Sequence, residues 1–133
     1  MRQGIQADFP HENLRKYGCY FFALLRWAET ITGIDYGEKD ILLLFEHFKR
    51  MGWVEDDCFV INPVSILNHC IRQQSFRTVS KSSSPTTKTF IVFLKKSGHG
   101  HFVLSHNGET WDSLEPDRPG AQDYKVDSYR VIA

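Results

Sequence analysis

A change in the spacing of apolar residues near residue 75 constrains this chain more than any other feature of its sequence. Before that point, apolar side chains recur every three or four residues, as a helix buried along one side requires. After it, short apolar runs alternate with turn residues, which is typical of strands. Helices that precede strands, instead of alternating with them, predict an α+β fold in which N-terminal helices pack on a C-terminal antiparallel β-sheet.

The first half of the chain is predicted to form helices after a polar, irregular segment over residues 1–12, which we call the lead-in. The predicted helices cover residues 14–32, 38–51 and 62–71. Gly18 lies near the start of the first helix and Gly33 ends it. This places Cys19 in the first helical turn, where exposed backbone amides and the helix dipole favour a thiolate.

The second half is predicted to form strands and turns. The predicted strands cover residues 75–80, 90–94, 101–105, 110–112 and 124–132, with loops at 81–87, 97–100 and 115–120. The continuous apolar run over 90–94 indicates a central strand that is buried on both faces.

A tight hairpin is predicted at Asn107-Gly108, a sequence that favours a two-residue turn between antiparallel strands. In that register residue 104 pairs with 111, and Asp112 lies opposite Val103. Asp112 is then on the same face as His101 and diagonal to it, within reach of the imidazole.

Length and composition favour one globular domain over residues 1–133. The chain is 41% hydrophobic and 14% aromatic, which is enough to bury a core. Sixteen basic and sixteen acidic residues cancel, so the cationic excess of a nucleic-acid or anionic-membrane binder is missing. No apolar run approaches the ~20 residues that span a bilayer, and the first ten residues do not resemble a signal peptide. We therefore expect a cytoplasmic protein that does not insert into membranes.

The three cysteines do not indicate a disulfide framework or a zinc site. An odd number leaves at least one thiol free, and Cys19, Cys58 and Cys70 never form a CxxC pair. Cys58 and Cys70 lie among apolar residues and are interpreted as packing residues. No metal or other cofactor is expected.

Three residues in order carry the chemistry that this sequence predicts. Cys19 opens a helix, His101 opens a strand about eighty residues later, and Asp112 lies on the partner strand. Thiol nucleophiles need this set, because the histidine accepts the thiol proton and the acid orients the ring. We therefore interpret them as nucleophile, base and orienting acid.

On these residues the chain resembles the papain-like cysteine peptidase superfamily. It is most similar to bacteriocin-leader-processing, or double-glycine, peptidases, and next to NlpC-type cell-wall peptidases. The matching pieces are Gly18-Cys19 leading into Ala23-Leu24-Leu25, Gly100-His101-Phe102-Val103, and Trp111-Asp112-Ser113-Leu114. The resemblance covers roughly residues 13 to 115, and it implies a papain-like fold and the three catalytic roles above.

Two positions depart from the family pattern. The family usually has a glutamine six residues before the cysteine, where it helps to bind the oxyanion, and this chain has Asn13. Gln3 or Gln6 would supply an amide if the lead-in folds back. Tyr20 stands where a glycine often follows the cysteine, so we expect it, together with Trp111, to line the substrate groove.

Rival assignments stay open for the base and the acid. His99 is the alternative base, although a position between two glycines favours an exposed loop. Asn107, Glu115 and Asp117 compete with Asp112 as the acid. A metal site at the three neighbouring histidines would need ligands from both faces of a strand, and no HExxH pattern supports it.

These residues predict a cysteine peptidase or amidase that cleaves a peptide or peptidoglycan-like amide. A transglutaminase-like acyl transfer would use the same triad. The alternative from another class is a catalytically weak or inactive papain-like module that acts as a binding or regulatory protein, of phage or plasmid type. The departures at Asn13 and Tyr20 favour that alternative, and the sequence leaves the oligomeric state open.

Overall fold

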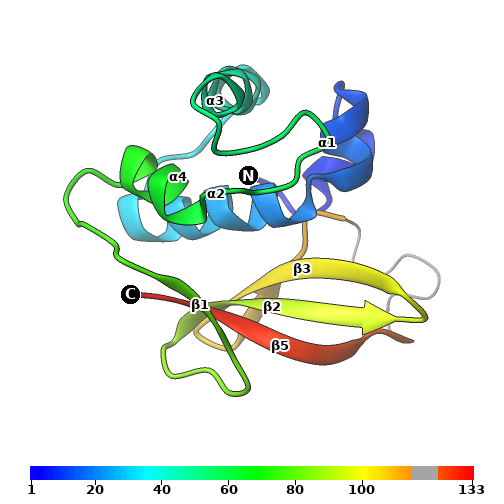
Figure 1. The fold of residues 1–133 in the computed structure, drawn as a ribbon. Helices are drawn as coiled ribbons and strands as arrows, with labels where there is room; N and C mark the ends of the chain where they lie inside the picture. The colour runs from blue at the N-terminus through cyan, green and yellow to red at the C-terminus, as the bar shows by residue number, and fades with distance from the viewer. Residues whose placement is uncertain (115–122) are drawn as a thin grey trace.

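Helices from the first half of the chain cover a sheet built from the second half (Figure 1). The computed structural model describes residues 1–114 and 123–133. Its elements are η1 (Ile5–Asp8), α1 (Glu12–Tyr17), α2 (Cys19–Thr32), α3 (Glu38–Arg50), α4 (Pro63–Cys70), β1 (Val79–Ser82), β2 (Thr89–Lys96), β3 (His99–His106), β4 (Glu109–Trp111) and β5 (Lys125–Ile132). The predicted α+β order, with N-terminal helices and a C-terminal antiparallel sheet, is confirmed.

The sheet has five strands in the order β1-β5-β2-β3-β4, and each neighbouring pair is antiparallel. The predicted hairpin is confirmed: Leu104 pairs with Trp111 across a turn at Asn107 and Gly108, which both have positive φ angles. The regular pairing ends at Trp111, so Asp112 follows β4 directly. The central strand β2 buries the consecutive side chains of Ile91 and Val92 on its two faces, but the rest of the predicted buried run over 90–94 is only partly buried.

Helix α2 is the innermost helix, lying between the sheet and α3 (Figure 1). Phe21, Leu24 and Leu25 of α2 are fully buried, as the three-and-four spacing predicts. Phe22 and Ala23 are buried as well, so this inner helix is covered on more than the one side that the sequence predicts. None of the helices in the described ranges has the length and apolar character needed to cross a membrane.

Gly18 divides the first predicted helix in two, which corrects the expectation of one continuous helix. Helix α1 ends at Tyr17 and α2 begins at Cys19. The amide of Gly18 donates to the Leu14 carbonyl over 3.0 Å. A Cβ atom at position 18 would lie 2.5 Å from that carbonyl oxygen, so only glycine allows the backbone to pack this closely. The break makes Cys19 the first residue of a helix.

The lead-in is irregular over most of its length, as predicted, but it is held more firmly than the sequence suggests. It contains η1, and it buries the side chains of Ile5 and Phe9 in the core. Its backbone also bonds to the chain after β4: Gly4 donates to the Asp112 carbonyl over 2.9 Å, and Gln6 donates to the Ser113 carbonyl over 2.7 Å. The first residues of the chain therefore lie beside the candidate catalytic acid.

Two strand boundaries also differ from the prediction. Strand β1 covers Val79–Ser82 instead of residues 75–80, because pairing with β5 fixes its position. The turn after β2 is shorter than predicted, since the positive φ angles fall at Ser97 and Gly98 and β3 already begins at His99. The predicted loop at 115–120 lies outside the described residues.

Candidate active site

His101 and Asp112 form a buried pair. The Nε2 atom of His101 lies 2.6 Å from Oδ1 of Asp112, and their side chains are 5% and 12% exposed. The same carboxylate oxygen accepts a hydrogen bond from the Leu114 amide over 2.9 Å. The structure thus brings together two residues that the hairpin register predicts to be neighbours.

The lead-in fixes the position of Asp112 from the other side. Gln3 accepts a hydrogen bond from the Asp112 amide over 2.7 Å and donates to the Thr110 carbonyl over 2.9 Å. Next to it, the Ser113 hydroxyl donates to Oε1 of the buried Gln6 over 2.6 Å. Because the Asp112 backbone is held by both Gln3 and Gly4, its carboxylate is directed at His101 by a rigid support. Sequence reasoning considered Gln3 and Gln6 only as sources of an amide for the oxyanion.

Cys19 is partly exposed and is the first residue of α2. Its thiol interacts with the imidazole of His101 and favours the protonated form of the ring. Burial lowers the pKa of His101, but hydrogen bonds with Asp112 and Cys19 outweigh it and raise the pKa to about 9. The imidazole therefore holds its proton at neutral pH. A protonated histidine beside a cysteine at a helix N-terminus is an arrangement that supplies a thiolate nucleophile.

The two nitrogens of the His101 ring have separate partners. Because Nε2 is bound to Asp112, Nδ1 is the nitrogen available to exchange a proton with the Cys19 thiol. In this geometry the carboxylate orients the ring and stabilises the imidazolium.

Asn13 does not point its amide at the triad in this structure. Its Nδ2 atom donates to the carbonyl of Asp56 over 2.9 Å and approaches the Asp56 carboxylate at 3.3 Å. The Gln6 amide donates to the Arg15 carbonyl over 3.1 Å, and the Gln3 amide is held by Thr110. The amide side chains that the sequence offered for the oxyanion are each engaged by the backbone.

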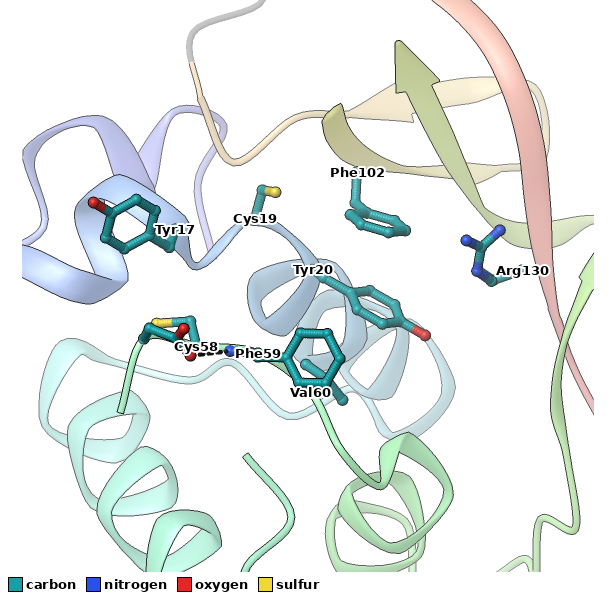
Figure 2. A pocket seen from close by; sticks show the side chains of 9 residues that line it. Tyr17, Cys19, Tyr20, Cys58, Phe59, Val60, Phe102 and Arg130 are labelled. Carbon is teal, nitrogen blue, oxygen red and sulfur yellow. Dashed lines mark hydrogen bonds between the residues drawn. The ribbon is translucent and has the colours of Figure 1, made fainter. Parts of the chain in front are cut away.

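A cavity of about 640 Å³ opens beside Cys19 (Figure 2). It is lined by Tyr17, Cys19, Tyr20, Asp57, Cys58, Phe59, Val60, Phe102 and Arg130. Tyr20 is one of the lining residues, and its ring stacks on Phe102 with centroids 4.2 Å apart. Its role in substrate binding stays a prediction. Trp111 is not among the lining residues. The expectation that Trp111 lines the groove is therefore wrong for this cavity: the residue is only 6% exposed, and its indole nitrogen donates to the Met1 carbonyl over 3.2 Å.

The other two cysteines, Cys58 and Cys70, have raised pKa values. Burial, followed by the neighbouring carboxylates of Asp57 and Asp56, raises the pKa of Cys58 to about 12. Burial also raises the pKa of Cys70 to about 11, against a hydrogen bond from Tyr36. Both thiols stay protonated at neutral pH, so neither competes with Cys19 as a nucleophile.

The rival residues are placed away from these contacts. His99 is exposed, and His106 bonds through Nδ1 to the Thr89 hydroxyl over 2.6 Å. Asn107 forms the hairpin turn. Glu115 and Asp117 lie outside the described residues. Within the described part of the chain, no three His, Cys, Asp or Glu side chains gather as metal ligands.

Comparison with known proteins identifies a family for nearly the whole chain. A family model described as "Protein of unknown function, DUF261" matches residues 4–133. This range includes Cys19, His101, Asp112 and every residue that lines the cavity. No curated protein and no solved structure matches the chain.

Proposed function

The chain belongs to the DUF261 family, and we propose that it is a cysteine peptidase or amidase of papain-like type. Cys19 is the nucleophile, His101 the base and Asp112 the orienting acid. The observation that carries this proposal is the buried His101–Asp112 pair, 2.6 Å apart, next to a cysteine that opens a helix and borders a cavity. The helices that cover an antiparallel sheet are consistent with the papain-like resemblance.

The chemistry follows from the two nitrogens of His101. In the proposed resting pair the proton of the Cys19 thiol is held on Nδ1 of the His101 imidazolium, and the thiolate attacks the carbonyl carbon of the amide substrate to form a carbon–sulfur bond. The imidazolium then donates this proton to the amide nitrogen as the carbon–nitrogen bond breaks and the amine leaves. Water adds to the resulting thioester with His101 as base, which releases the carboxylic acid and restores the thiol.

The oxyanion of the tetrahedral intermediate needs donors close to Cys19. The first backbone amides of a helix have no intrahelical acceptor, so the Cys19 N–H at the start of α2 is one candidate donor. Asn13 is still the predicted second donor to the oxyanion. To act in that way, its side-chain amide must first break its hydrogen bond to the Asp56 carbonyl.

The hydrogen bond from Asn13 to the Asp56 carbonyl favours a second candidate function, a papain-like binding or regulatory module with little or no turnover. With the Asn13 amide held by Asp56, the site has no side-chain donor assigned to the oxyanion, and removing one such donor costs about 10²–10³ in rate. Transglutaminase-like acyl transfer requires the same triad and differs only in the acceptor of the acyl group.

Thiol labelling tests the proposal. We expect iodoacetamide to modify Cys19 below pH 8 faster than Cys58 and Cys70, as followed by mass spectrometry of peptides. In His101→Ala the fast reaction at Cys19 should be lost. His106→Ala serves as the matched control, since His106 lies on the same strand and bonds to Thr89. Slow, equal labelling of all three thiols would contradict an activated cysteine.

Peptide hydrolysis then separates the two candidate functions. The native protein is incubated with a mixed peptide library, and new termini are identified by mass spectrometry. A peptidase produces cleavages that are absent with Cys19→Ala. Fast labelling of Cys19 with no cleavage at all supports the binding module.

A further inference from the structure

The cavity beside Cys19 has an extended apolar wall. Figure 2 shows the stacked rings of Tyr20 and Phe102 between Cys19 and Arg130, with Phe59 on the facing side. Phe59 is 63% exposed, an unusual position for a phenylalanine in a folded chain. A cavity with aromatic walls that are open to solvent is suited to a large apolar side chain.

Arg130 forms the far end of this cavity. Its guanidinium lies over the rings of Phe102 and Phe93, 5.5 and 5.6 Å from their centroids. Its Nη1 atom bonds to the Ser128 hydroxyl over 2.9 Å and to the Tyr129 carbonyl over 3.3 Å. Among the described residues no carboxylate lies within ion-pair distance of Arg130, which leaves its remaining donors for an incoming anion.

The lining of the cavity also includes a negatively charged residue. Asp57 is a lining residue next to Cys58, and its carboxylate accepts a hydrogen bond from the Phe59 amide over 3.1 Å. An anionic group is therefore repelled near Asp57 and attracted at Arg130. The two charges give the cavity a direction along which an acidic ligand aligns.

From these observations we infer, building on the proposed function, that the substrate is a peptide in which a large apolar residue adjoins an acidic one. The apolar side chain packs between Phe59 and the Tyr20–Phe102 stack, and the acidic side chain binds Arg130. A double-glycine segment would leave both the aromatic walls and the guanidinium without a partner.

Binding to the Cys19→Ala protein tests this inference without requiring turnover. The probes are acetylated dipeptide amides of aspartyl-phenylalanine and asparaginyl-phenylalanine, together with the two reversed sequences, measured by isothermal titration calorimetry. In one of the two orders, we expect the aspartyl peptide to bind about tenfold more tightly than its asparaginyl partner, as a charge-assisted hydrogen bond gives. Acetylated glycyl-glycine amide should bind more weakly than either.

Variants of Arg130 test whether this residue causes the preference for the aspartyl peptide. Adding Arg130→Gln should abolish the difference between aspartyl and asparaginyl peptides, whereas Arg130→Lys should keep part of it. Arg77→Gln is the matched control, because Arg77 is exposed and does not line the cavity. Thermal unfolding of each variant checks that the fold is intact, and the comparison of peptides on the Arg130-containing protein does not depend on those variants.

Equal binding of the aspartyl and asparaginyl peptides, binding of none of them, or tighter binding of glycyl-glycine would overturn the inference. The outcome is separable from that of the labelling experiment. A preference for the acidic peptide in a protein whose Cys19 is unreactive keeps the ligand assignment and removes the peptidase. A reactive Cys19 in a protein that shows no preference for the acidic peptide keeps the peptidase proposal and removes the ligand assignment.

Discussion

Cys19 is positioned by the residues immediately before it, whereas Asp112 is held by Gln3, 109 positions away in the sequence. The cysteine is partly exposed and borders an open cavity, while His101 and Asp112 are almost completely buried. The proposed nucleophile has to meet its substrate, so a local backbone feature at an exposed helix end is enough to place it. The proposed base and acid need a dry and rigid setting, and here long-range contacts provide it.

A glycine precedes both Cys19 and His101, for different reasons. At Gly18 a Cβ atom would meet the Leu14 backbone at 2.5 Å, and at Gly100 it would meet the Phe93 ring at 2.6 Å. The first contact is with the backbone, which cannot turn away. The second is with a ring already packed on Phe102. The Gly-Cys and Gly-His pairs in the sequence are thus explained by packing.

The largest effect is expected where the buried pair is broken. With Asp112→Asn, burial continues to lower the pKa of His101 and the Cys19 contact still raises it, but the contribution of the Asp112 carboxylate is gone, so the pKa should fall from about 9. Loss of a buried charge partner should lower the free energy of unfolding at pH 6 by about 3 kcal/mol. Ring NMR titration of His101 and urea unfolding measure the two quantities.

The stabilisation by the His101–Asp112 pair should decrease as the pH rises. Because the folded protein raises the pKa of His101, the pair stabilises the native state fully below about pH 6.5. That contribution is lost as the pH rises through about 9. The stability difference between native protein and Asp112→Asn should therefore narrow above pH 9, and a difference that widens would contradict the assignment. Asp123→Asn, which alters an exposed ion pair with Lys96, is the control.

A smaller effect on stability is expected from a change at Gly18, the residue before Cys19. Gly18→Ala should lower the free energy of unfolding by about 1–3 kcal/mol, because the added methyl group forces α1 away from α2. The start of α2 should shift with it, so iodoacetamide should label Cys19 more slowly. Gly37→Ala is the matched control, since its Cβ atom would meet only the Asp40 carboxylate, at 3.5 Å. Unchanged labelling in Gly18→Ala would show that Cys19 does not depend on this junction.

The smallest effect is expected in the support of the acid. Gln3→Met removes the bonds to the Asp112 amide and the Thr110 carbonyl at similar side-chain size, and should cost about 1 kcal/mol of unfolding free energy. If the lead-in positions the carboxylate, the pKa of His101 should also fall in this variant. Gln74→Met, at an exposed position, should change neither quantity. A loss of stability with an unaltered His101 titration would limit Gln3 to a structural role.

The sequence was sufficient for features that depend on neighbouring residues. Three-and-four spacing predicted α2, α3 and α4, and Asn107-Gly108 predicted the hairpin register that brings Asp112 to His101. Features that depend on distant segments were not predictable in this way. The contact of the lead-in with the chain after β4 has no periodicity to reveal it, and the Asn13 bond to Asp56 depends on a loop folded by its own turn.

The contact between the lead-in and the chain after β4 has a consequence for how the site is assembled during synthesis. The ribosome makes α2 early, so Cys19 leaves the exit tunnel well before His101 and Asp112 exist. Until residues 101–113 arrive and pair with residues 3–6, Cys19 has neither His101 nor Asp112 beside it. The proposed activation of its thiol therefore requires the finished fold, and a chain arrested before that point would lack it.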